Sequence, residues 1–413
     1  MSASPSSLWT QVTGGITTPH GFNASGIKAG LKSSGNLDLA LLLAPEGSTC
    51  SGFFTESVIR AHCVDLTAQR LISNDGNARA VLINSGQANA CTGQRGLEDN
   101  FKATKVLADL LGLNVDEVLI CSTGVIGEPI PIDKLLNNLE SLVKALSSTG
   151  SSDAAHAILT TDLITKEVAL LGNLGDHPVR IGGIAKGSGM IHPNMATMLG
   201  FLTCDVRIPR KIWSAMLKRV VGCSFNAITV DGDTSTNDSF LAFSGGEFLA
   251  EQYFDDLEDG LLKTCQYLAK SIARDGEGAT CLIQVEVEGT SSDLEALVIA
   301  RTIASSSLVK TAINGDDPNW GRIVAAAGRA GIPFASELLS LWIGPYHLMS
   351  EGEPRDFDHL EVSRYIKEKK NGSYLDEDTV KIKLIVGENK GSGVSWGCDL
   401  SDQYVRINAD YKT

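Results

Sequence analysis

Apolar runs of strand length alternate with helical stretches along the chain. Residues 80–84 and 118–121 are short apolar runs between polar residues, which is the pattern of buried strands. Residues 97–113 carry apolar side chains at helical spacing, and this spacing predicts an amphipathic helix. Residues 380–386 alternate between apolar and polar positions over most of their length, as a strand with one exposed face does. Strands mixed with helices in this way predict an α/β fold.

The remaining elements continue this mixture. They are a helix capped by Asp133, a helix that starts at Pro209, a helix over 257–273 and a strand over 281–287. Because strands with alternating faces are typical of antiparallel sheets, we expect layered mixed sheets with helices outside, rather than a doubly wound parallel sheet. Residues 350–378 are rich in charge and predict a long surface insertion.

Composition narrows the range of functions. The chain has 413 residues, 43% of them hydrophobic and 20% charged, which is typical of a globular protein of two or three domain-sized units. Its apolar runs are too short to cross a bilayer, and its first residues lack the features of a secretory signal. The formal net charge of −14 (35 − 49) argues against nucleic-acid binding. Nine scattered cysteines without a Cys-x-x-Cys pair favour reduced thiols in a cytoplasmic protein. The chain has no P-loop or dinucleotide motif, so we expect no cofactor.

The segment 186–199 contains the strongest candidate for catalysis. A glycine-rich turn with one lysine leads to Thr197, which stands between apolar residues. If the backbone is cut between Ala196 and Thr197, Thr197 carries a free amine beside its own hydroxyl, and one residue then supplies both base and nucleophile. An isolated threonine in this setting more often only packs or begins a strand, so the segment needs support from other blocks.

Four further blocks provide that support: residues 121–127, 160–162, 274–280 and 408–413. Taken singly, each reads as an ordinary turn or chain end. Together with residues 186–199, they closely resemble the ornithine acetyltransferase family of arginine biosynthesis, also called glutamate N-acetyltransferases. The resemblance runs nearly end to end.

The resemblance implies a self-processing enzyme of the N-terminal-nucleophile type. It would be cut into an α chain (1–196) and a β chain (197–413) that stay associated, with two of each in a heterotetramer. Thr197 would take the acetyl group of N2-acetyl-L-ornithine and pass it to L-glutamate through an acetyl-threonyl intermediate. Some relatives also use acetyl-CoA as a co-substrate, and the sequence leaves this open for the present chain.

The resemblance also assigns roles to single residues. Thr123 and Gly124 would form the oxyanion hole, since glycine lets backbone N–H groups turn toward a ligand and the threonine hydroxyl adds a donor. Substrate would contact Thr197 and five further residues, which are Thr160, Lys186, Glu277, Asn408 and Thr413. Thr160 is preferred to its neighbour Thr161.

Two of these residues carry charges that match the substrates. Lys186 would hold a substrate carboxylate, although a lysine is most often a solvated surface residue. Glu277 lies between two glycines, where we expect an exposed carboxylate on a tight turn that suits the terminal ammonium of ornithine.

Three more blocks match the family without a defined role: residues 84–93, 230–238 and 315–322. We expect turns that line or support the site. Residues 230–238 resemble the start of a calcium loop, but they lack the glycine and the bidentate glutamate that such a loop needs, so no metal site is predicted. His192, five residues before Thr197, is expected to pack and not to catalyse.

Two other functions stay open at this point. An amidase or aminopeptidase with an N-terminal nucleophile would use water as the acceptor in place of glutamate. A non-catalytic binder of small metabolites would keep an uncut chain.

Overall fold

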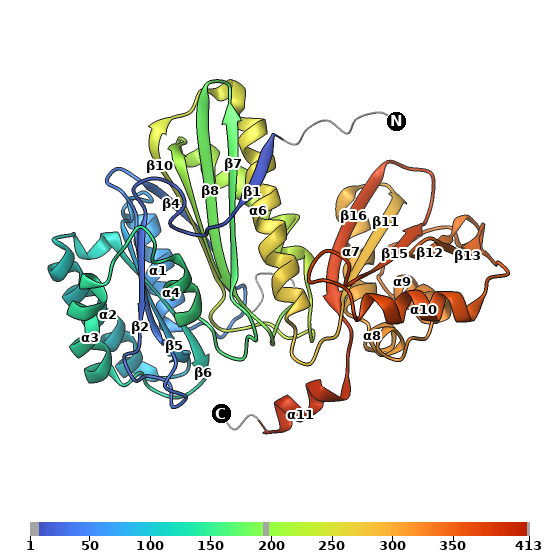
Figure 1. Cartoon of the computed structure of the whole chain (residues 1–413), viewed down its shortest axis with the longest axis horizontal. Coiled ribbons are helices and arrows are strands. Elements are labelled where there is room, and N and C mark those ends of the chain that lie inside the picture. Colours follow the sequence, from blue (N-terminus) through green and yellow to red (C-terminus); the bar gives the residue numbers. More distant parts are fainter. Residues whose placement is uncertain (1–7, 193–197, 411–413) are drawn as a thin grey trace.

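The computed structural model describes residues 8–192 and 198–410 and contains three β-sheets with helices packed against them (Figure 1). Two sheets face each other across an apolar core, and helices cover their outer faces. The third sheet, in orange and red, forms a separate layer toward the C-terminus. The expected α/β class, with layered mixed sheets and helices outside, is confirmed.

The N-terminal sheet has the strand order β2-β3-β5-β6, in which β5 and β6 are parallel and the other neighbours antiparallel. Its strands are β2 (Asn23–Ile27), β3 (Leu39–Leu43), β5 (Ala80–Gln87) and β6 (Val118–Val125). Its outer face is covered by α1 (His62–Ser73), α2 (Gly93–Leu111) and α3 (Ile132–Lys144). Leu39 and Leu41 pack with these helices, whereas Ala40 and Leu42 pack toward the next sheet. Because both faces are buried, these strands need continuous apolar runs.

The central sheet has the order β1-β7-β8-β9-β10-β4, with β9 and β10 parallel and the other neighbours antiparallel. Its strands are β1 (Trp9–Val12), β4 (Thr49–Phe54), β7 (Lys166–Leu174), β8 (His177–Lys186), β9 (Leu199–Arg207) and β10 (Ser239–Phe248). Helices α5 (Arg210–Gly222) and α6 (Phe254–Arg274) cover its outer face, and α4 (Ser151–Ala157) packs in the core between the two sheets. Strands β8 and β9, which come before and after the predicted cut in the sequence, thus belong to the same sheet.

The C-terminal sheet has the order β14-β13-β12-β15-β11-β16, in which β11 and β15 are parallel. Its strands are β11 (Leu282–Thr290), β12 (Ser340–Ile343), β13 (Tyr346–Ser350), β14 (Glu353–Pro354), β15 (Thr379–Ile385) and β16 (Gly391–Cys398). Its apolar core includes residues of α7 (Asp293–Ala304), α8 (Ser307–Asn314), α9 (Trp320–Gly328) and α10 (His359–Lys369). The last helix, α11 (Asp402–Asp410), extends away from this unit (Figure 1).

Several local expectations need correction. Asp133 lies in the first turn of α3, whose N-cap is Pro131. The predicted surface insertion over 350–378 contains α10, whose Val362 and Ile366 are buried in the C-terminal core, because charged residues fill only the outer face of that helix. In the described part of the chain, no single helix meets the length and hydropathy of a membrane span; α7 and α8 do so only as a pair, bent by 57°.

Candidate active site

Six of the predicted site residues line one cavity of about 300 Å³. They are Thr123, Gly124, Thr160, Lys186, Glu277 and Asn408. Thr161 lines it as well, so both neighbouring threonines are available to a ligand. The predicted nucleophile Thr197, its cleavage partner Ala196 and the terminal Thr413 lie outside the described residues. A larger groove of about 910 Å³ beside β1 and the start of α4 contains none of these residues, so the smaller cavity is the candidate site.

Thr123 and Gly124 lie near the end of β6, and not in a turn after it. Gly124 pairs with Gly86 of β5 and has a φ of +132°; a Cβ built there would clash with the Gly86 carbonyl group. This position therefore requires glycine. Thr123 is 5% exposed and still borders the cavity, so the strand holds it rigidly at the cavity wall.

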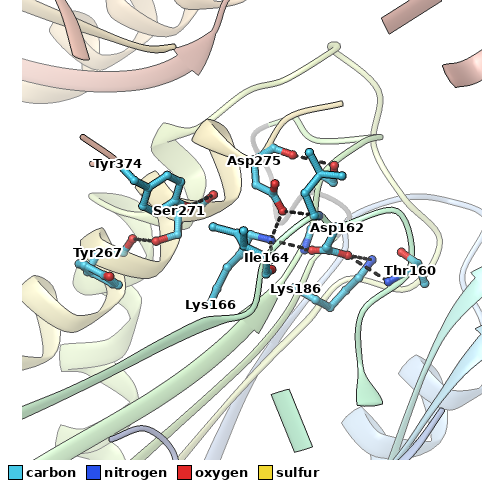
Figure 2. A network of polar contacts seen from close by, with 12 residues as sticks. Thr160, Asp162, Ile164, Lys166, Lys186, Tyr267, Ser271, Asp275 and Tyr374 are labelled. Atoms are coloured by element: carbon cyan, nitrogen blue, oxygen red, sulfur yellow. Dashed lines mark hydrogen bonds and ion pairs between the residues drawn. The ribbon is translucent and has the colours of Figure 1, made fainter. Parts of the chain in front are cut away.

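A buried ionic network borders the cavity (Figure 2). Lys166 Nζ lies 2.8 Å from Asp162 Oδ1 and 2.6 Å from Asp275 Oδ2, and Lys186 Nζ lies 3.9 Å from Asp162 Oδ2. All four side chains are at most 4% exposed. Two ammonium groups are balanced by two carboxylates, which is the condition under which charges persist without water.

Asp162 also fixes the backbone around the cavity. Its carboxylate accepts the N–H groups of Thr160 at 3.1 Å and Gly187 at 2.6 Å. Burial opposes its ionisation, but Lys186 and Lys166 together hold the pKa of Asp162 below its ordinary value. For Lys186 burial outweighs the attraction of Asp162 and lowers the pKa. The Lys186 ammonium thus has little water around it and only a distant contact with Asp162, at 3.9 Å, so it can bind a carboxylate ligand as well.

Glu277 and Asn408 meet at the cavity through α11. Asn408 Nδ2 donates to Glu277 Oε2 at 2.8 Å, and the backbone N–H of Glu277 donates to the carbonyl oxygen of Ser188 at 3.0 Å. A Cβ at Gly189 would lie 2.7 Å from the Glu277 carboxylate carbon, so glycine permits this close approach. Glu277 is half-buried and not exposed as predicted from its turn, because long-range contacts bring α11 against it.

Two aspartates of the 230–238 block hold the chain on both sides of the undescribed segment 193–197. Asp231 accepts the N–H groups of Met190 and Ile191 at 2.6 and 3.0 Å. Asp238 accepts the N–H of Met198 at 3.0 Å, and burial raises the pKa of Asp238 well above its ordinary value. Both ends of the predicted cleavage segment are thus anchored to one block.

Asn237 joins that block to two others. Its Nδ2 donates to the carbonyl oxygens of Ala88 at 2.6 Å and Ser122 at 2.8 Å, so the predicted supporting role fits two of the three unassigned blocks. Residues 315–322, which form the turn after α8 and the first turn of α9, are not among the described residues that line the cavity, so a supporting role for them stays a prediction. There the side chain of Asn319 caps α9.

Three of the four charged residues in the buried network have no role that a sequence pattern indicates: Asp162, Lys166 and Asp275. Asp162 and Asp275 stand inside the quoted blocks, whereas Lys166 belongs to none of them. The ion pair between Lys166 and Asp275 joins β7 to the end of α6, which are more than a hundred residues apart in the sequence, so no local pattern predicts it. His192 Nδ1 lies 3.2 Å from the Thr229 hydroxyl, and His192 is not among the described residues that line the cavity.

Comparison with known proteins gives matches along the whole chain. Residues 23–413 match the ArgJ family. The arginine biosynthesis bifunctional protein ArgJ of Prochlorococcus marinus (strain MIT 9313) is 62% identical over 100% of this chain and 97% of its own length. ArgJ 1 of Nostoc sp. (strain PCC 7120) is 53% identical over 98% of this chain and 99% of its own length. The crystal structure of argJ from Bacillus halodurans is 42% identical over 52% of this chain and 100% of that chain, with a TM-score of 0.48.

Replacing Asp162 by Asn should destabilise the protein by about 3 kcal/mol or more, because two buried ammonium groups lose a shared counter-charge. Since folding lowers the Asp162 pKa, its contribution is complete above the ordinary Asp pKa of about 3.9 and is lost as the pH falls below it. Thermal midpoints of parent and variant should therefore differ most at neutral pH, and the difference should shrink progressively as the pH falls below about 4 toward the lowered pKa of Asp162. As a control, Asp109→Asn removes only an exposed ion pair with Lys105 and should change little. Equal midpoints at pH 7 would contradict the role of Asp162.

Proposed function

Because this chain belongs to the ArgJ family, we propose that it moves the acetyl group of N2-acetyl-L-ornithine to L-glutamate in arginine biosynthesis. Its relatives bear the name arginine biosynthesis bifunctional protein ArgJ, which agrees with the family expected from sequence. One observation carries the proposal for the site: Thr123, Gly124, Lys186 and Glu277, from distant parts of the sequence, line one cavity.

In the first half-reaction, the Thr197 hydroxyl oxygen attacks the acetyl carbonyl carbon of acetylornithine. The new C–O bond replaces the amide C–N bond, and ornithine leaves. The free α-amine of Thr197 takes the hydroxyl proton and returns it to the leaving nitrogen. Thr123 and Gly124 stabilise the negative charge on the carbonyl oxygen. Their fixed position at the cavity wall supports this proposed role.

In the second half-reaction, the amino nitrogen of glutamate attacks the carbonyl carbon of the acetyl ester. A C–N bond forms, the C–O bond breaks, and a proton passes from the amine to the threonine oxygen. One amide replaces another over the cycle, so this exchange needs no energy-rich donor. Direct acetylation of glutamate from acetyl-CoA remains a second activity to assay.

Charge complementarity orients the donor. The Glu277 carboxylate receives the terminal ammonium of the ornithine part, since Asn408 holds that carboxylate at the cavity. Lys186 receives the α-carboxylate, because its ammonium is buried and its contact with Asp162 is distant, at 3.9 Å. Thr160 and Thr413 complete the proposed substrate contacts.

We also infer self-cleavage between Ala196 and Thr197, which yields an α chain of residues 1–196 and a β chain of residues 197–413. The central sheet supports this proposal, because β8 and β9 stand on either side of the link and pair with each other. The pairing would keep the two chains together after cleavage. From the family resemblance, we also propose that two α and two β chains assemble into a heterotetramer. We propose the cytoplasm as its location.

Thr197→Ala should abolish both cleavage and acetyl transfer, since the variant lacks the hydroxyl for either step. Intact mass spectrometry of the parent after brief exposure to acetylornithine should give two chains, with a gain of about 42 Da on the β chain alone, as expected for an acetylated nucleophile. Thr149→Ala, at an exposed threonine, serves as the control. Normal splitting of the Thr197 variant would remove Thr197 from its proposed role.

Thr123→Ala should lower kcat about 10²- to 10³-fold with little change in KM, the usual effect of losing one oxyanion donor. Thr123→Ser keeps the hydroxyl and should retain most of the rate. Both are measured on fully processed protein. An unchanged kcat in the alanine variant would show that the hydroxyl is not an oxyanion donor.

The requirement for glutamate separates transfer from hydrolysis. With acetylornithine alone, the parent should release ornithine only to about one equivalent per site and then stop, because the acetyl-enzyme awaits an acceptor. Adding glutamate should restore turnover and produce N-acetylglutamate. Continuous release of acetate without glutamate would instead indicate an amidase or aminopeptidase.

A further inference from the structure

A second cavity, of about 480 Å³, adjoins the candidate active site. Gly124 and Thr160 line both cavities, so the two spaces meet at the proposed oxyanion hole. Lys32 and Glu128 are the charged residues among those that line the second cavity. A substrate whose reacting carbonyl lies beside Gly124 can therefore extend its tail in either of two directions.

Lys32 offers a positive charge at the second cavity. Its Nζ donates to the carbonyl oxygen of Leu37 at 2.8 Å, and in the described part of the chain it forms no ion pair, in contrast to Lys186. Burial lowers the pKa of Lys32 to about 8, against the attraction of Asp38. A half-buried ammonium group with one hydrogen-bond acceptor has capacity for an anionic ligand.

Asp38 fixes the loop that carries Lys32. Its buried carboxylate accepts the backbone N–H groups of Ala29 at 2.6 Å, Leu31 at 2.6 Å and Lys32 at 3.0 Å. Because these amides occupy the carboxylate, Asp38 positions the backbone of Lys32 and makes no direct ion pair with its side chain. The lysine therefore stands on a rigid support beside the cavity.

The two substrates of the proposed reaction carry opposite charges on their tails. Acetylornithine ends in an ammonium group, which Glu277 attracts, whereas glutamate ends in a carboxylate, which Glu277 repels. The acceptor tail thus needs a cation away from Glu277. Lys186 is shared with Asp162 and suits the α-carboxylate that both substrates have, which leaves Lys32 for the acceptor tail.

The geometry points to Lys32 as the residue that binds the side-chain carboxylate of the acceptor glutamate, an inference that rests on the acetyl-transfer function proposed above. Donor and acceptor then share the reacting position beside Gly124 and diverge from it, the ammonium tail toward Glu277 and the carboxylate tail toward Lys32. Glu128 opposes this binding, although its exposure to solvent weakens part of the repulsion.

Lys32→Met tests the assignment, because it removes the charge, keeps an unbranched side chain that is only one heavy atom shorter, and keeps the backbone N–H that binds Asp38. The two half-reactions are measured separately on processed protein, as acetyl-enzyme formation from acetylornithine and as its discharge by glutamate or glutamine. Discharge by glutamate should require about 10- to 100-fold more substrate, the usual effect of losing a hydrogen bond between charged groups. Acetyl-enzyme formation should be unchanged, and the preference for glutamate over glutamine should disappear. Lys32→Arg should restore part of that preference.

Lys134→Met is the matched control, since Lys134 donates to the carbonyl oxygen of Gly30 on the same loop and does not line the described cavity. It should leave both half-reactions unchanged. Glu128→Gln should lower the KM for glutamate and leave the KM for acetylornithine unchanged. This variant tests the assignment if Lys32→Met does not fold.

Two results with Lys32→Met would overturn the assignment. The first is an equal loss of activity in both half-reactions, which would mean that Lys32 binds a group common to both substrates. The second is an unchanged preference for glutamate over glutamine. An unchanged KM for glutamate in Glu128→Gln would also contradict the assignment of Lys32. Failure of the parent enzyme to transfer acetyl groups would instead refute the proposed function itself.

Discussion

The arrangement of the candidate site depends on a carboxylate that cannot leave its place. The side chain of Asp162 is fully buried, with lysine ammonium groups on two sides and two backbone amides bound to its oxygens. Ionised groups removed from water are stable only when every partner is present, so displacing one partner exposes the others to a large desolvation cost. This requirement connects the loop before β7, the end of β8 and, through Lys166, the Asp275 carboxylate at the end of α6. The cavity wall that carries Thr160 and Lys186 is rigid for this reason.

The sheets bring this wall to the other reactive groups. Strand β6 of the N-terminal sheet presents Thr123 and Gly124, and the turn after α6 presents Glu277. Asn237 then ties β6 to the 230–238 block, whose aspartates hold the residues on both sides of segment 193–197. Cutting that segment would leave these anchors intact, because each of them contacts residues outside the segment.

The positions of the charged residues around the site match the acetyl transfer that we propose for it. One nucleophile must serve a donor with a cationic tail and an acceptor with an anionic tail. A single charged pocket would favour one of them and repel the other, whereas separate regions around Glu277 and Lys32 allow each tail its own partner. Lys186 stands between these regions, beside a carboxylate that only partly neutralises it.

The sequence by itself determined the family, the α/β class and which chemical groups are available, because these depend on local composition and on motifs read along the chain. It also located β5 and β6, since strands buried on both faces need continuous apolar residues. Helix ends were less certain: the predicted cap at Asp133 falls inside α3. Only the tertiary structure decided which charges are buried and paired, as for Lys166 with Asp275, and that Lys186 and Lys32 face different cavities. Burial and pairing arise from contacts between distant segments, and they change the energy of a charge far more than its neighbours in sequence do.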